Sequence, residues 1–137
     1  MIREIVKDTF MLMKKSLPAS RADLSAARDL LDTLKFHSAG CAGMAANMIG
    51  VNKNIIAVFI GEVPVVMLNP RVVSHSPESY ETEEGCLSLT GTRKTSRWYT
   101  VEVEYYDMMM KKHRINYSGF TAEVIQHEMD HCSGIII

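Results

Sequence analysis

The last long helical segment of the chain leaves almost no face for solvent, and this restricts the fold more than any other feature. Hydrophobic periodicity predicts a helix that begins after Ser118-Gly119 and ends near Cys132. At 100° per residue, one stripe of this helix carries apolar side chains together with His127 and His131, and the roughly opposite stripe is apolar as well. Such a helix is expected to lie between other elements, with both histidines turned inward.

The rest of the chain supplies the elements that could surround this helix. A second helix is predicted after Ser20, where Asp23 lies in a capping-box-like position, and should end near Phe36. Alternating or apolar runs predict strands at Ile55 to Ile60, Val65 to Leu68, Thr100 to Asp107 and around Ile115 to Tyr117. We therefore expect an α+β fold with antiparallel β-sheets around the central C-terminal helix and the 21–35 helix packed outside.

Length and charge narrow the class of protein. A chain of 137 residues fits one hydrophobic core, so a single domain over residues 1–137 is expected. The 16 acidic and 15 basic side chains give a net charge of −1, which disfavours direct nucleic-acid binding. No apolar run is long enough for a signal peptide or a membrane span, so a cytoplasmic protein with reduced cysteines is predicted.

The segment His127-Glu128-Met129-Asp130-His131 fits the pattern H-E-x-x-H. On a helix, histidines four residues apart share a face and can hold the same metal ion. A pair of hydrogen-bonded core histidines is the alternative. It is disfavoured, because turning two imidazoles and a carboxylate into a core is costly without a shared partner.

A catalytic metal usually has three protein ligands and one open position, so a third ligand is needed. An extended zinc-protease motif would place it at position 137, but that residue is Ile137. Cys86 is the best upstream candidate, because Gly85 allows close backbone approach and a thiolate is a strong ligand for a borderline-soft metal. Cys41 is the second choice, and the remaining candidates are acidic residues and three histidines expected to be exposed, His37, His75 and His113.

Two segments carry a resemblance to a known family. Glu84-Gly85-Cys86-Leu87-Ser88 and Gln126-His127-Glu128-Met129-Asp130-His131 are similar to the second and third signature motifs of the peptide deformylases. The segment from Cys41 to Gly50 resembles a degenerate form of their first motif. The motifs keep the order of the family, and the similarity covers most of the chain after about residue 20. In length the chain resembles the shorter forms of the family.

The resemblance implies a function and a site. It implies removal of the formyl group from N-formylmethionyl peptides, at nascent chains on the ribosome, by a monomeric enzyme. The implied metal ligands are Cys86, His127 and His131, around one divalent ion that is Fe(II) in the cell, with zinc, nickel or cobalt also accepted. Glu128 would take and return a proton, and the backbone N–H of Leu87 would stabilise the oxyanion.

Two departures from the family pattern fall in the first motif. Met48 stands where the family has a glutamine that donates to the oxyanion, and a thioether cannot donate a hydrogen bond. Loss of one such donor typically costs 10²–10³ in rate, so reduced activity is predicted. Cys41 replaces the first glycine. The residues predicted to contact the substrate are Gly43, Met44, Met48 and Arg93.

Other functions stay open at this point. The chain could be a non-catalytic homologue that keeps the metal and binds formylated N-termini. The H-E-x-x-H helix would also suit a metallopeptidase of different specificity, whereas a hydrolase with Cys86 as nucleophile fits two inward histidines poorly. Either Glu84 or Asp130 could orient a ligand histidine.

Overall fold

The computed structural model describes the whole chain, Met1–Ile137. Its helical elements are α1 (Thr9–Leu12), η1 (Arg21–Asp23), α2 (Leu24–Phe36), η2 (Ala46–Ile49) and α3 (Gly119–Cys132). Its strands are β1 (Gly43–Ala45), β2 (Ile55–Ile60), β3 (Val63–His75), β4 (Ser79–Cys86), β5 (Leu89–Trp98), β6 (Thr100–Tyr106) and β7 (Lys112–Ser118). One antiparallel sheet has the strand order β1-β2-β3-β6-β7, and β4 pairs with β5 in a second sheet.

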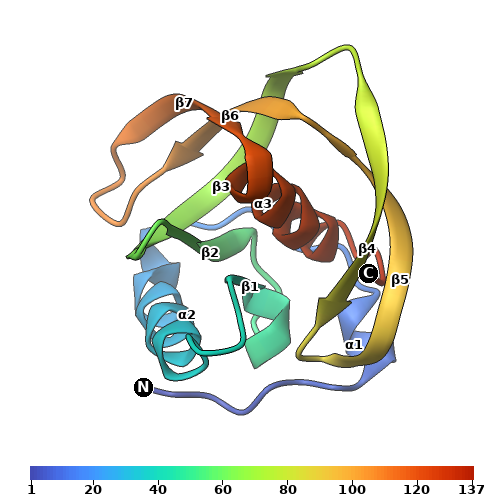
Figure 1. Cartoon of the computed structure of the whole chain (residues 1–137). Coiled ribbons are helices and arrows are strands. Elements are labelled where there is room, and N and C mark those ends of the chain that lie inside the picture. Colours follow the sequence, from blue (N-terminus) through green and yellow to red (C-terminus); the bar gives the residue numbers. More distant parts are fainter.

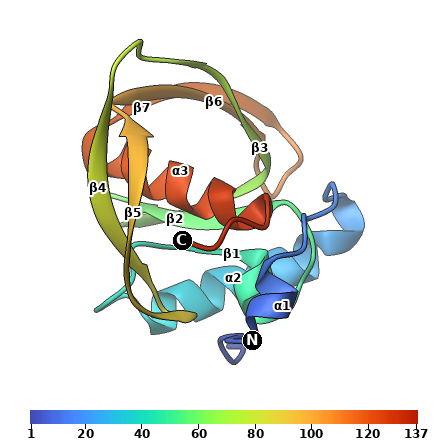
Figure 2. The ribbon, with the colours of Figure 1, turned by 90° about the vertical axis from the view of Figure 1, so that its right-hand side faces the viewer.

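Helix α3 runs through the middle of the molecule, enclosed by strands of both sheets (Figure 1, Figure 2). Its buried residues include Ala122, Ile125, His127 and His131. Helix α2 packs on the outside, against β2 and β3. The predicted architecture, antiparallel sheets around a central C-terminal helix, is therefore confirmed.

Strand β2 is the common wall of two apolar clusters. Ile55 and Ala57 belong to the cluster that includes the buried face of α2. Ile56 and Val58 belong to the cluster that includes α3. Because successive side chains of a strand point to opposite faces, a continuous apolar run is what a strand buried on both sides requires.

The predicted cap at Ser20 is present. The Ser20 side chain accepts a hydrogen bond from the N–H of Ala22, and Asp23 accepts one from the N–H of Ser20 at 2.8 Å. A 3₁₀ turn, η1, comes between this cap and α2, which ends at Phe36 as expected. None of the helices has the length and apolar content that crossing a bilayer requires.

Strand β3 is much longer than the predicted segment that ended at Leu68. It continues to His75 through a bulge, where the pairing with β6 shifts between Leu68 and Arg71. Asn69 takes a left-handed conformation there, with φ of 52°, and Pro70 sits where no ladder donor is needed. The bulge bends the strand around α3 (Figure 2).

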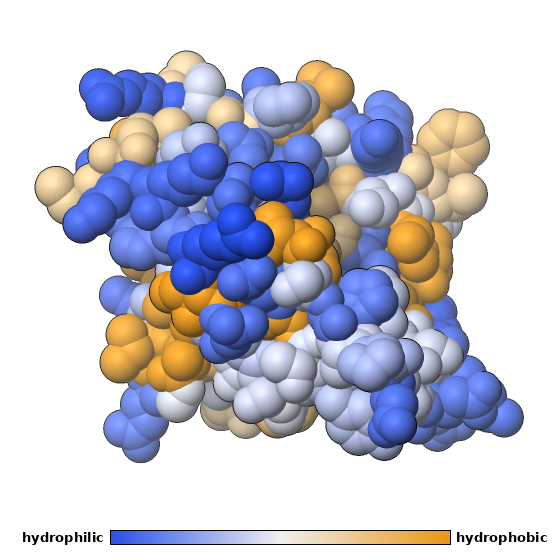
Figure 3. All heavy atoms as spheres, turned by 90° about the horizontal axis from the view of Figure 1, so that it is seen from above, coloured by the Kyte–Doolittle hydropathy of each residue, from blue (hydrophilic) through white to orange (hydrophobic).

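The β4–β5 hairpin was not predicted. Most of its side chains are polar and partly exposed, so its sequence shows no apolar alternation. Strand β7 also exceeds the short return strand expected around Ile115 to Tyr117. Seen from above, hydrophilic residues cover most of the surface and apolar ones form separate patches (Figure 3).

Asn69 anchors the N-terminal part of the chain to the bulge. Its side chain accepts from the N–H of Ala19 at 2.7 Å and donates to the carbonyl of Ala19 at 2.9 Å. Asn69→Ala removes both bonds and places alanine at positive φ. We expect it to lower the free energy of unfolding by about 2–4 kcal/mol, measured by chemical denaturation. Asn116→Ala, at an exposed position, should change it by less than about 0.5 kcal/mol; equal losses would contradict this assignment.

Candidate metal centre and cleft

Three side chains with metal-binding atoms converge at the centre of the molecule. His127 and His131, one turn apart on α3, turn their Nε2 atoms toward each other at 3.2 Å. Cys86 comes from the end of β4, where the N–H of Ser88 points at its Sγ from 3.4 Å. The three ligand atoms all lie within 4.8 Å of one another. Cys41, the second choice for a third ligand, is not in this group.

Glu84 holds the outer nitrogen of one histidine. Its carboxylate lies 2.7 Å from Nδ1 of His127, and both side chains are buried. A carboxylate only accepts, so Nδ1 carries the proton and Nε2 is left facing Cys86 and His131. Of the two residues considered for this role, Glu84 therefore touches the histidine directly.

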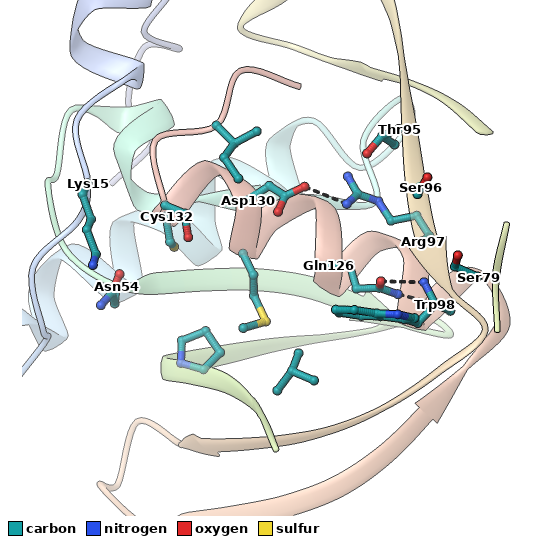
Figure 4. A pocket seen from close by; sticks show the side chains of 15 residues that line it. Lys15, Asn54, Ser79, Thr95, Ser96, Arg97, Trp98, Gln126, Asp130 and Cys132 are labelled. Atoms are coloured by element: carbon teal, nitrogen blue, oxygen red, sulfur yellow. Dashed lines mark hydrogen bonds and ion pairs between the residues drawn. The ribbon is translucent and has the colours of Figure 1, made fainter. Parts of the chain in front are cut away.

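Asp130 is linked to His127 only indirectly: it binds Arg97 on β5, and Arg97 binds Glu84. Arg97 is 4% exposed; it donates to Glu84 at 2.6 Å and to Asp130 at 2.7 Å. Figure 4 shows this contact on the side of α3 that faces a second pocket, with Gln126 bound to the backbone of Trp98 beside it. The role of Arg97 could not be predicted from the sequence, because it depends on the pairing of β4 with β5.

The surroundings set the charge that each histidine can carry. Burial lowers the pKa of His131 to about 4, which favours the neutral ring that binds metals. Burial also opposes a charge on His127, but hydrogen bonds with Cys86 and Glu84 outweigh it and raise the pKa of His127 to about 10. The same groups that hold a proton there would stabilise a cation at Nε2.

Glu128 lies beside these ligands and is 4% exposed. Burial raises the pKa of its carboxyl to about 7, and its Oε1 has no hydrogen-bond partner in the chain. Gly43 makes room for it: a Cβ at Gly43 would stand 2.7 Å from Cγ1 of Val124 and 3.1 Å from Cγ of Glu128. A carboxyl that titrates near neutral pH suits proton transfer.

A cleft of about 1220 Å³ opens onto these groups. Of the residues predicted to contact a substrate, Gly43 and Met48 line it, as does Leu87. Met44 does not; it is fully buried in the core beneath. Arg93 also lies outside the lining, with its guanidinium directed at the carbonyl of Thr90.

Met48 and Asn47 are fixed in different directions. The Sδ of Met48 accepts from the N–H of Ala45 at 3.4 Å and lies 4.0 Å from Sγ of Cys86. The amide of Asn47 donates to the carbonyl of His131 at 2.9 Å, so it cannot replace the missing glutamine. Cys41 lines the cleft and donates to the carbonyl of Gly43 at 2.9 Å.

The other histidines lie apart from the centre. His75 is exposed and stacks on Trp98, with ring centroids 3.7 Å apart. His113 is half-buried and lies 2.7 Å from Asp107, and His37 is half-buried at the end of α2. The expectation that all three are exposed is therefore wrong for His37 and His113, which neighbouring side chains and turns partly cover.

The donor set fits one divalent metal. A thiolate and two imidazoles suit borderline-soft ions, and two buried histidines with facing Nε2 atoms need a shared partner. Glu128, the residue after His127 on α3, has a buried carboxylate oxygen, Oε1, without a hydrogen-bond partner. The residues present can therefore hold the kind of ion that the sequence pattern predicted.

Comparison with known proteins gives the same family throughout. The family model described as Polypeptide deformylase matches residues 2–137. A peptide deformylase of Clostridium beijerinckii is 50% identical over 137 residues, which is 100% of both chains. One from Desulfitobacterium hafniense is 32% identical over 130 residues, covering 92% of this chain and 85% of the relative.

Solved structures agree. The peptide deformylase of Thermotoga maritima superimposes with a TM-score of 0.89 at 24% identity, covering 99% of this chain and 95% of that one. A Met-Ala-Ser-bound class I type b peptide deformylase of Acinetobacter baumannii gives 0.88 at 26% identity, with 99% and 97% covered. With a matching family model and a full-length relative at 50% identity, the chain belongs to the peptide deformylase family.

Proposed function

We propose that this protein is a metal-dependent hydrolase that removes the N-formyl group from N-formylmethionyl peptides of newly made proteins. The observation that carries the proposal is the convergence of Cys86, His127 and His131 beside buried Glu128, in a chain of this family. A relative of the same fold has been solved with the peptide Met-Ala-Ser bound.

Cys86, His127 and His131 are the proposed ligands of one divalent ion, with Fe(II) as the native metal and zinc, nickel or cobalt as substitutes. Such an ion, when bound, lowers the pKa of a water toward about 7 and so supplies hydroxide at neutral pH. Glu84 and Arg97 keep the His127 ring in the orientation that this role needs.

Glu128 is the proposed carrier of the proton. In the proposed reaction it takes a proton as water attacks the formyl carbon, and it returns one to the departing amine when the C–N bond breaks. The products are formate and a free N-terminal methionine. Burial of Glu128 raises the pKa of this carboxyl to about 7, and its Oε1 has no hydrogen-bond partner in the chain. Gly43 leaves the space in which the side chain lies.

The turn that follows β4 would supply one hydrogen-bond donor to the oxyanion. The backbone N–H of Leu87 makes no hydrogen bond within the chain, and Leu87 lines the cleft. The side chain of Met48 has no N–H group and cannot supply a second donor. We propose that Gly43 and Met48 contact the substrate, and that Met44 only supports the floor on which it lies.

The proposed substrate also sets where the protein acts. Newly made formylated chains are found at ribosomes, so the proposal places the protein in the cytoplasm with nascent chains as partners. All the residues proposed for the reaction come from one chain, which is consistent with a monomer.

The role of Glu128 can be tested by Glu128→Gln, which keeps the shape of the side chain but removes the base. We expect formate release from a formyl-Met peptide, by anaerobically prepared, iron-loaded protein, to fall by about 10²–10⁴. Glu123→Gln is the matched control: it lies on the same helix and lines the same cleft, where it accepts from Tyr80. Its rate should stay within a few-fold. Wild-type protein with no turnover above buffer would remove the enzymatic proposal.

Gly43→Ala tests whether the space at Gly43 sets the place of Glu128. The added carbon must push Val124 and Glu128 away, so kcat/KM should fall by about 10²-fold. Gly40→Ala, where nothing lies within 4 Å of the added carbon, should leave it unchanged. A fully active, folded Gly43→Ala protein would show that Glu128 does not depend on this contact.

Met48 favours a second candidate function, a non-catalytic homologue that binds formylated N-termini without cutting them. If the missing donor limits the rate, Met48→Gln should raise formate release by about 10–100-fold, whereas Met48→Leu should not raise it. Tight binding of a formyl peptide without product, in wild type and Met48→Gln alike, would support the second candidate instead.

A further inference from the structure

Met48 places a second sulfur next to the proposed metal ligands. Its side chain is 1% exposed, yet it lines the cleft that opens onto Cys86 and His127. The Sδ of Met48 lies 4.0 Å from Sγ of Cys86, as the acceptor of the Cys86 thiol. The N–H of Ala45 holds the same sulfur from the other side at 3.4 Å. The thioether is therefore fixed in place.

The separations match those of ligands that share one ion. Two sulfur donors at about 2.3 Å from a tetrahedral ion lie about 3.8 Å apart, and two nitrogen donors at about 2.0–2.1 Å lie about 3.3 Å apart. The distances here are 4.0 Å between the sulfurs of Cys86 and Met48 and 3.2 Å between the Nε2 atoms of His127 and His131.

We propose that, when Cys86, His127 and His131 hold a soft cation, the Met48 thioether becomes a fourth, weak donor and takes the open position that the proposed reaction would give to water. The Met48 sulfur faces the Cys86 sulfur at 4.0 Å, so a cation bound to Cys86 on this side would meet the thioether. Two histidines, one cysteine and a weakly bound methionine form a ligand set that soft metals accept.

Cys41 is the other sulfur of the cleft, and its geometry makes it the weaker candidate. Its thiol donates to the carbonyl of Gly43 at 2.9 Å, so it is directed at the backbone and not at Cys86. A thioether, in contrast, needs no deprotonation to bind a metal. The inference rests on the metal site proposed above, but not on turnover of any substrate.

The test uses the full chain loaded with Cd²⁺, whose X-ray absorption fine structure counts sulfur and nitrogen ligands. We expect two sulfurs and two nitrogens in the wild type, and one sulfur in Met48→Leu. Competition with a chromophoric chelator should show about tenfold weaker Cd²⁺ binding by Met48→Leu. Met44→Leu is the matched control, because Met44 is a buried methionine of the same segment; it should keep two sulfurs.

The outcomes separate this inference from the proposed function. One sulfur in the wild type, or two in Met48→Leu, would overturn the role of Met48 while the three-ligand site stands. Loss of the second sulfur in Cys41→Ser, with Met48 intact, would assign it to Cys41 and overturn the inference. Cadmium bound without any sulfur would remove the metal site itself.

Discussion

One buried guanidinium joins the parts from which the site is built. Arg97 on β5 binds Glu84 on β4 and Asp130 on α3, and Glu84 in turn holds His127. Removing one partner of a buried ion pair typically costs about 3–5 kcal/mol, because a charge is then left without compensation. The hairpin and the central helix are therefore held in a fixed relation. The distance between Cys86 at the hairpin end and the two histidines depends on that relation.

Much of the fold could be predicted from the sequence, where a segment carries its own signal. Helix α3 and the two inward histidines followed from periodicity, and α2 from its cap and apolar stripe. The β4–β5 hairpin could not be predicted, because its side chains are polar on both faces. The full length of β3 was missed for another reason: Asn69 and Pro70 read as a strand end, whereas a bulge carries the pairing past them.

The same limit applies to the site. The H-E-x-x-H pattern marks its own residues, because their spacing alone puts two imidazoles on one helical face. The roles of Glu84 and Arg97 depend on strand pairing, and those of Gly43 and Met48 on how β1 and the turn after it approach α3. Met44 shows the difference plainly. It stands beside Gly43 in the chain, but alternation along β1 sends it into the core on the other side.

Strand β2, with apolar clusters on both faces, has a consequence for how the chain finds its fold. Shifting its alignment with β1 and β3 by one residue would send Ile56 and Val58 toward α2, and Ile55 and Ala57 toward α3. Both faces of the shifted strand would still be apolar, so the shift would not expose apolar side chains to solvent. The native register must therefore be selected by shape: α2 would meet a branched side chain in place of Ala57, and α3 would meet Ala57 in place of a branched side chain.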